Sequence, residues 1–282
     1  MTLSEYKATF DSCERIGKGG QKLVYRAKKM GHEYALKIIT TSDDPRIQQE
    51  IEILKSLGLP NVPRILGVGT VQDDISHDAL LCILEEYIDG RSLREELRAR
   101  GTISCTMGCS ILETLLDIEM SLEDKSILHR DIKPDNVMIR NDGKIFLIDF
   151  GIAKILGCTS LTRTALPNGP CTPAYAPREL AGNMKRLQDV RTDLYQIGLT
   201  VYEALGGVNP FSIGAKNKTE MLTRGSTIIP PALQIPGDTK GLLMQYLSML
   251  MSKNQSQRPS SAREARRYYD AVYPTLSLGG AV

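Results

Sequence analysis

The alternation of hydrophobic and polar residues changes along the chain, from short strand-like runs to longer helix-like segments. The early runs are rich in β-branched and aromatic residues and end at turn signals, which is typical of strands. They predict strands over residues 23–27, 32–39 and 79–84. After Asp89-Gly90 the apolar residues recur at helical spacing, which predicts helices around residues 92–99, 104–124, 189–205, 238–252 and 260–272. We therefore expect a small strand-rich part followed by a larger helical part, with a boundary near residues 86–91.

One helix is expected inside the strand-rich part. It begins near Asp43-Asp44-Pro45, where acidic residues and a proline mark a first turn, and it ends at Gly58. Ile47, Ile51 and Leu54 share one apolar face at helical spacing.

The composition favours a globular protein in a reducing compartment. The net charge is +2 and the cations are scattered, so the sequence gives no support for nucleic-acid binding. No apolar run approaches the ~18 residues that a membrane span needs, and the N-terminus lacks a signal-peptide core. Cys105 and Cys109 lie four residues apart on a predicted helix, but without a second pair or a nearby histidine we expect core packing, not a metal site. These observations predict a soluble, cytoplasmic protein with reduced thiols.

Two short acidic motifs carry the clearest chemistry in the chain. The first is the loop 129–136, His-Arg-Asp-Ile-Lys-Pro-Asp-Asn, in which Asp131 is followed by Lys133 and Asn136. The second is Asp149-Phe150-Gly151, which follows an apolar strand over residues 144–148. Together they contain groups suited to holding Mg²⁺, neutralising phosphate and orienting a hydroxyl.

These motifs resemble the catalytic loop and the DFG motif of protein kinases, in the expected order. The resemblance extends from about residue 10 to residue 272 and is strongest to the bacterial eukaryotic-like serine/threonine kinases. It implies an α+β, bilobal fold, with a small antiparallel-sheet N-lobe that has one main helix and a larger, mostly helical C-lobe. The implied divisions are the N-lobe 1–86, the hinge 87–91, the C-lobe 92–275 and a tail 276–282.

The resemblance also implies roles for the loop residues. Asp131 would orient the acceptor hydroxyl and receive its proton, and Lys133 would reach the γ-phosphate. Asn136 and Asp149 would hold Mg²⁺. A lysine at position 133 is usual in serine/threonine kinases, whereas tyrosine kinases tend to have Ala-Ala-Arg or Arg-Ala-Ala there.

Upstream, the motif Tyr34-Ala35-Leu36-Lys37 resembles the strand whose lysine contacts the α- and β-phosphates. Glu50, with Leu54 four residues later, is its expected helical ion-pair partner. Ile16-Gly17-Lys18-Gly19 begins a glycine-rich loop, in which Lys22 replaces the third glycine of the family pattern. Gly17 and Gly19 would still let the backbone approach phosphate oxygens.

The adenine site implied by the resemblance contains one unusual residue. Val24, Ala35 and Met138 would sandwich the ring, and the Glu86 carbonyl and Ile88 amide would pair with its edge. In this register Glu85 takes the position usually held by an apolar gatekeeper. A buried carboxylate must be paired, so we expect Glu85 to interact with Lys37 or with the surroundings of Glu50 in an inactive arrangement. The alternative is that the register is shifted by one residue, so that Leu84 and not Glu85 takes the buried gatekeeper position.

The segment from Asp149 to Glu179 resembles a kinase activation segment. Thr162 and Thr164 are similar to the twin threonines that related bacterial kinases phosphorylate on themselves, with Arg130 as the phosphate partner. The alternative is a polar loop in which hydroxyls are simply common. Thr172 is expected to contact Asp131 and Lys133.

Three further positions are expected to support the segment and the catalytic loop. Pro177-Arg178-Glu179 replaces the family's Ala-Pro-Glu, and Glu179 should pair with Arg258. Asp193 resembles the buried helix start that anchors the catalytic loop, and Tyr195 stands where many kinases have tryptophan.

The function implied by the resemblance is ATP-dependent phosphorylation of serine and threonine in proteins, with Mg²⁺, or alternatively Mn²⁺, as the cation. The chief alternative is a pseudokinase that binds nucleotide or partners without transfer, although Lys37, Asp131, Asn136 and Asp149 are all present. A small-molecule phosphotransferase would generally lack the docking segment 172–179 and Arg258. A homodimer, and a longer membrane-anchored kinase of which this chain is the cytoplasmic domain, remain open.

Overall fold

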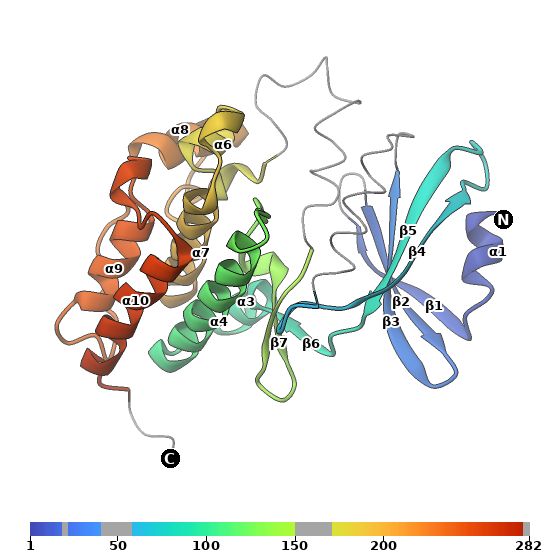
Figure 1. Cartoon of the computed structure of the whole chain (residues 1–282), viewed down its shortest axis with the longest axis horizontal. Helices are drawn as coiled ribbons and strands as arrows, with labels where there is room; N and C mark the ends of the chain where they lie inside the picture. The colour runs from blue at the N-terminus through green and yellow to red at the C-terminus, as the bar shows by residue number, and fades with distance from the viewer. Residues whose placement is uncertain (19–21, 41–57, 150–170, 279–282) are drawn as a thin grey trace. The chain divides into compact units, whose positions relative to one another are not determined.

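The computed structural model describes residues 1–18, 22–40, 58–149 and 171–278 (Figure 1). These residues form two compact units, and the chain passes from the first to the second between Asp89 and Gly90.

The first unit is built on a five-stranded antiparallel sheet in the order β1-β2-β3-β5-β4. The predicted strands 23–27, 32–39 and 79–84 are confirmed within β2, β3 and β5. Met30 and Gly31, both with positive φ (51° and 76°), form the tight turn between β2 and β3. The strand bounds are β1 Ser12–Lys18, β2 Lys22–Lys29, β3 His32–Thr40, β4 Ile65–Gln72 and β5 Ala79–Glu86.

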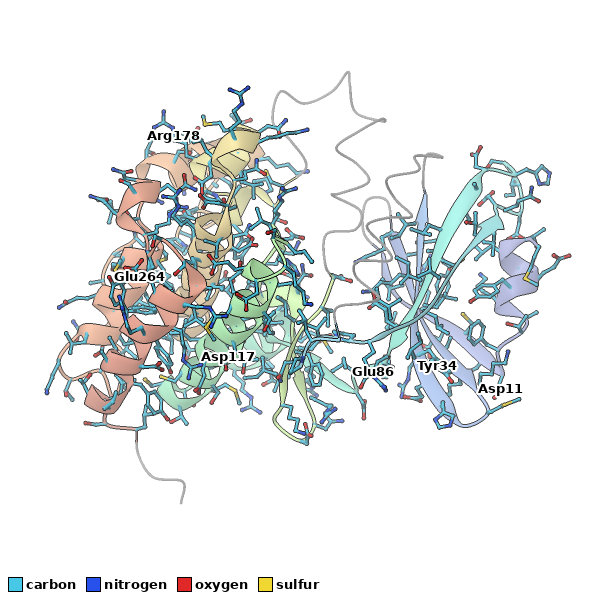
Figure 2. All side chains as sticks on the ribbon, in the orientation of Figure 1. Asp11, Tyr34, Glu86, Asp117, Arg178 and Glu264 are labelled. Carbon is cyan, nitrogen blue, oxygen red and sulfur yellow. The ribbon has the colours of Figure 1, made fainter. Side chains whose placement is uncertain are left out.

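One face of this sheet is covered by the N-terminal segment. The short helix α1 (Leu3–Lys7), which begins with a Thr2/Glu5 capping box, and the following Phe10 pack on it. The sheet contributes Tyr25, Ala27, Leu36, Ile38, Val71, Leu80 and Cys82 to this core. Because side chains alternate along a strand, Ala35 and Lys37 lie on the opposite face from Leu36. Tyr34 and Glu86, paired across β3 and β5, mark one end of the sheet (Figure 2).

The second unit is mostly helical and contains one small antiparallel sheet, β6-β7-β8. The strands are β6 Gly90–Ser92, β7 Val137–Arg140 and β8 Ile145–Leu147. The helices are α3 Leu93–Arg100, α4 Cys105–Glu123, α6 Arg178–Ala181, α7 Val190–Gly206, α8 Lys218–Thr227, α9 Leu242–Leu250 and α10 Ala262–Val272, and the short 3₁₀ turns are η1 Pro134–Asn136, η2 Pro173–Tyr175, η3 Lys185–Leu187, η4 Gln255–Gln257 and η5 Tyr273–Thr275. Gly90 is required at the start of β6, because a Cβ there would lie 2.2 Å from the Ile139 carbonyl oxygen.

Helix α7 lies at the centre of the second unit and packs against α4, α9 and α10. Gly198 permits the close approach of α9, since a Cβ at this position would lie 2.7 Å from the Leu250 Cβ. Arg266 of α10 donates to Glu113 and to Asp117 of α4, which ties these two helices together. Figure 2 labels Asp117 on α4. The largely buried helix α7 therefore supports the helices that pack around it.

Most predicted helices are found in the second unit. Those around 92–99, 104–124, 189–205 and 260–272 correspond to α3, α4, α7 and α10. The prediction 238–252 begins too early, because Gly241 has a left-handed φ of 68° and α9 begins at Leu242. Helix α8 was not predicted; of its residues only Gly225 is buried, so no apolar stripe marks it.

The predicted α+β architecture, a small antiparallel-sheet unit and a larger helical unit, is confirmed. The predicted helix that carries Glu50 and Leu54 lies outside the described residues, as do Gly19, Thr162 and Thr164. In the described ranges, the structure contains no helix long and apolar enough to cross a bilayer.

Candidate active site

The predicted catalytic loop, residues 129–136, is held in place by a buried acid on α7, Asp193. The carboxylate of Asp193 accepts hydrogen bonds from the His129 amide (2.6 Å) and from the Arg130 amide (2.7 Å). Arg130 has a φ of +60°, a strained conformation for a non-glycine residue. The two charge-assisted hydrogen bonds to adjacent amides hold the loop in this conformation. The predicted anchoring role of Asp193 is confirmed.

A second polar residue of α7, Gln196, also holds the loop and was not anticipated from the sequence. Its Oε1 accepts from the Ile132 amide at 3.0 Å, and its Nε2 donates to the carbonyls of Arg130 (3.3 Å) and Tyr175 (3.2 Å). Gln196 is fully buried. Gln196 therefore links the catalytic loop to the segment that contains Tyr175. The sequence feature that could have marked it is a glutamine within a mostly apolar helical run.

The carboxylate of Asp131 lies within a compact group of donors. Lys133 Nζ donates to Asp131 Oδ2 at 2.9 Å and to Thr172 Oγ1 at 2.9 Å. The Thr172 hydroxyl in turn donates to Asp131 Oδ1 at 2.7 Å. The predicted contacts of Thr172 with both residues are confirmed. Asp131 thus already accepts one aliphatic hydroxyl at the distance that a general base needs.

Asn136 and Asp149 lie at the ends of neighbouring segments of this unit. Asn136 is buried, and its Nδ2 donates to the Asp131 carbonyl at 2.8 Å. The Ile148 amide donates to the Asn136 carbonyl at 2.9 Å, which fixes the residue before Asp149 beside Asn136. Asp149 itself has a positive φ of 61°. With the Asn136 amide nitrogen directed to the loop, its Oδ1 and the Asp149 carboxylate are hard oxygen donors suited to a divalent cation.

His129 connects the catalytic loop to the chain that leads to Asp149. Its Nε2 lies 3.2 Å from the Ile148 carbonyl, and its Nδ1 lies 3.3 Å from the Asp131 amide nitrogen. A carbonyl only accepts and an amide N–H only donates, so the assigned tautomer is neutral with its proton on Nε2. The buried imidazole therefore links the loop to the segment that leads to Asp149.

The segment after Thr172 is fixed by a buried ion pair. Arg258 donates to Glu179 Oε1 at 2.6 Å, and its guanidinium also donates to the carbonyls of Arg191 and Ser252. The predicted Glu179–Arg258 pair is confirmed. Arg178, in contrast, is exposed at the start of α6 (Figure 2), so the substitution within the Pro177-Arg178-Glu179 motif leaves the buried pair intact.

Tyr195 packs beneath this ion pair. The Arg258 guanidinium carbon lies 4.8 Å from the centre of the Tyr195 ring, a cation–π contact. The Tyr195 hydroxyl reaches the Gly225 carbonyl (3.3 Å) and Lys253 Nζ (3.1 Å). Burial, and then the nearby Arg258, lower the pKa of Lys253 to about 8. A tyrosine thus supplies both the aromatic surface and a polar link to α8 at this position.

Arg94 joins four elements of the second unit and was not singled out from the sequence. Its guanidinium donates to Glu203 of α7 (2.5 Å), to the Tyr175 hydroxyl of η2 (2.6 Å) and to Asp135 of η1 (3.3 Å). The Tyr175 hydroxyl also donates to Glu203. Burial, and then the negative charge of Glu203, raise the pKa of Tyr175. The network connects α3 to the catalytic loop and to the segment after Thr172.

In the first unit, Lys37 and Glu85 form a buried ion pair. Lys37 Nζ lies 2.5 Å from Glu85 Oε2, and both residues are 6% exposed. The predicted interaction is confirmed. The alternative register, with Leu84 inside in place of Glu85, is wrong, because Leu84 packs on the α1-covered core on the other face of the sheet.

The other residues expected to contact a nucleotide are distributed over both units. Gly17 pairs with Val24 next to an irregularity in β1, and Val24 in turn pairs with Lys37. Ile16 is 50% exposed. The remaining members are Ala35 opposite Glu85, Glu86 at the end of β5, Ile88, which is buried, and Met138 on β7.

The model of the family described as the protein kinase domain matches residues 10–269. A probable serine/threonine-protein kinase of Clostridium perfringens, CPE1738, is 28% identical over 90% of this chain and 37% of its own length. The serine/threonine-protein kinase PrkC of Bacillus subtilis is 32% identical over 70% of this chain and 30% of its own length.

A eukaryotic relative is similar over a comparable range. The serine/threonine-protein kinase cds1 of Schizosaccharomyces pombe is 30% identical over 90% of this chain and 56% of its own length. The chain thus spans between about a third and just over half of the length of these three relatives. The family match covers nearly the whole chain and confirms the resemblance seen in the motifs: the chain belongs to the protein kinase domain family.

Proposed function

We propose that the chain is the catalytic domain of a serine/threonine protein kinase, which transfers the γ-phosphate of ATP to hydroxyls of proteins. The observation that carries the proposal is the arrangement around Asp131, whose carboxylate is held by Lys133 and accepts the Thr172 hydroxyl. An acceptor serine or threonine would present the same group to the same carboxylate. The proposal agrees with the names of the relatives, which are serine/threonine kinases.

In this reaction the acceptor oxygen forms a bond to the γ-phosphorus, and the bond to the bridging oxygen of ADP breaks. Asp131 orients the hydroxyl and takes its proton, while the Lys133 ammonium stabilises negative charge on the transferred group. Asn136 Oδ1 and the Asp149 carboxylate would hold a divalent cation, which we take to be Mg²⁺. The cation supplies charge neutralisation at the phosphates.

In this proposal the chain divides into an N-lobe over 1–86, a hinge over 87–91, a C-lobe over 92–275 and a tail over 276–282. Lys37 would contact the α- and β-phosphates next to its ion pair with Glu85, and the loop from Ile16 to Gly19 would cover the phosphates. The pairing of Lys37 with Glu50, which lies outside the described residues, stays a prediction. Val24, Ala35 and Met138 enclose the adenine, whose edge pairs with the Glu86 carbonyl and the Ile88 amide.

Regulation by phosphate is part of the same proposal. Phosphorylated Thr162 or Thr164 would pair with Arg130, whose backbone is already fixed by Asp193. A cytoplasmic location, alone or within a longer membrane-anchored kinase, and a homodimer stay predictions.

The direct experiment is transfer of label from γ-labelled ATP with Mg²⁺, and in parallel with Mn²⁺, to the protein itself and to a basic protein substrate. We expect label on serine or threonine, lost in Asp149→Asn. Asp117→Asn, an exposed acid on α4 (Figure 2), is the matched control and should retain transfer. Nucleotide binding without any labelled product would contradict the proposal and favour a pseudokinase.

A further inference from the structure

The ion pair between Lys37 and Glu85 is built into the sheet itself. Lys37 lies opposite Ile83, and Glu85 lies opposite Ala35, so Lys37 and Glu85 are diagonal neighbours on β3 and β5. Diagonal residues on one face are about 7–8 Å apart between their Cα atoms, which a lysine and a glutamate span with ease. Both backbones are fixed by the antiparallel ladder, so the carboxylate is held permanently within reach of the ammonium group.

The burial of this pair makes it persistent. Lys37 Nζ and Glu85 Oε2 are 2.5 Å apart, and each residue is 6% exposed. A buried charge that loses its partner is strongly penalised, whereas a matched pair with good geometry is tolerated. The positive charge of Lys37 is therefore largely compensated by a residue of its own sheet.

Two other carboxylates of the sheet do not take part in this interaction. Glu33 on β3 pairs with Arg26 and Lys28 at 2.7 and 2.8 Å. Glu86, the neighbour of Glu85, points to the other side of β5, where it pairs with Arg64 at 3.2 Å. Glu85 is thus the carboxylate that the sheet directs to Lys37, and Glu33 offers a chemically matched control.

We propose that Glu85 is a selectivity-determining residue of the nucleotide site, which competes with nucleotide phosphates for Lys37. The inference rests on the proposed function, in which Lys37 contacts the phosphates. Any phosphate oxygen that bonds to Lys37 Nζ must share the ammonium group with the Glu85 carboxylate, which already offsets part of its positive charge. Each added phosphate therefore gains less binding free energy from Lys37 than it would from a lysine without a carboxylate partner. The binding free energy of the nucleoside moiety is unaffected.

The test is the affinity of the full chain for adenosine, ADP and ATP with Mg²⁺, measured by titration calorimetry on the unaltered protein and on Glu85→Gln. Glutamine keeps the shape and a hydrogen-bond acceptor for Lys37 but removes the charge. We expect ATP to bind about tenfold more tightly to Glu85→Gln, a change of about 1.4 kcal/mol, and adenosine to bind equally to both. Glu33→Gln should leave the affinities for all three ligands within about twofold.

A double-mutant cycle separates this competition from a general effect on the sheet. In the unaltered background, Glu85→Gln is expected to raise ATP affinity about tenfold relative to adenosine. In a Lys37→Met background the same substitution should give at most half of that gain, expressed as free energy, because no ammonium group is left to compete for. An equal gain for adenosine and ATP, or a full gain without Lys37, would overturn the inference. If Glu85→Gln does not fold, Glu85→Met is used in the same cycle, with the same expectation for ATP against adenosine.

The outcomes also distinguish the inference from the function on which it rests. Unchanged ATP affinity in Glu85→Gln, in a protein that binds ATP and transfers phosphate, would overturn the inference alone. Failure of the unaltered protein to bind ATP would overturn the proposed function, and this inference with it.

Discussion

Glu119 of α4 is a buried acid that lies close to Asp193, the residue that holds the catalytic loop. The side chain is fully buried, and within the described part of the chain neither carboxyl oxygen has a hydrogen-bond partner. Burial first, and then the negative charges of Asp193 and Glu123, raise the pKa of Glu119 well above its ordinary value. A raised pKa favours the neutral form of Glu119, which carries no like charge beside the buried Asp193.

This environment predicts a specific dependence of stability on pH. A carboxyl whose pKa is higher in the folded than in the unfolded state contributes fully only below the unfolded value of about 4.3, and its contribution is lost as the pH rises toward the folded pKa. Glu119→Leu should remove this loss and raise the free energy of unfolding at pH 8 by about 1–3 kcal/mol. Urea unfolding at pH 5 and pH 8 measures both effects. The same decline in the variant as in the unaltered protein would contradict the assignment.

The Arg258–Glu179 pair gives a second prediction at the scale of single residues. Arg258→Met leaves the Glu179 carboxylate buried without its guanidinium, so we expect a loss of about 3–5 kcal/mol in the free energy of unfolding. Arg178→Met, which removes an exposed arginine next to Glu179, should change stability by less than about 0.5 kcal/mol. Chemical denaturation of both variants provides the comparison, and equal losses would show that burial of the pair is unimportant.

At the scale of elements, the Arg94 network couples α3, η1, η2 and α7. Because η2 follows Thr172 and η1 follows Lys133, the network fixes the two segments that would present the acceptor hydroxyl to Asp131. Its loss should affect the protein substrate more than the nucleotide, since Arg94 contacts the η1 and η2 segments.

We therefore expect Arg94→Gln to lower kcat/KM for a peptide substrate about tenfold, a loss of about 1.4 kcal/mol, with little change in the KM for ATP. Arg98→Gln, an exposed arginine on the same helix, is the control and should retain full activity. Steady-state kinetics with each substrate varied in turn decide the matter. Equal effects on peptide and ATP would indicate a general loss of structure.

What could be read from the sequence also depends on scale. Residues that act within one short motif, such as Asp131, Lys133 and Asn136, were found because their spacing is local. Gln196, Arg94 and Tyr175 were missed because their contacts join distant segments; Arg94 and Glu203 are 109 residues apart. Glu85 was identified because the family resemblance places it at a position usually held by an apolar gatekeeper, where a buried carboxylate needs a partner.

The same contrast holds for the elements. Strands β2, β3 and β5 carry short runs rich in apolar and β-branched residues and were located closely. Helix α8 lacks an apolar stripe and is defined by its Asn217 cap, and the start of α9 is set by the backbone of Gly241. Such ends follow from local backbone geometry, which hydrophobic periodicity does not encode.

For the whole molecule, the two units divide the chemistry. The first unit carries Lys37 and its compensating Glu85, and the second carries Asp131, Asn136 and Asp149 with the helices that hold them. The supports of the second unit, Asp193 and Gln196, come from the buried helix at its centre. A rigid helical core thus positions the proposed base, while a sheet residue sets the charge at the proposed phosphate site.

The central claim is that Asp131 acts on the acceptor hydroxyl in phosphate transfer. The measurement that tests it most directly compares Asp131→Asn with the unaltered protein in single-turnover transfer from γ-labelled ATP, alongside the Kd for ATP. We predict a rate lower by about 10²–10⁴-fold and an affinity for ATP within about threefold. Transfer at an undiminished rate in Asp131→Asn would contradict the account.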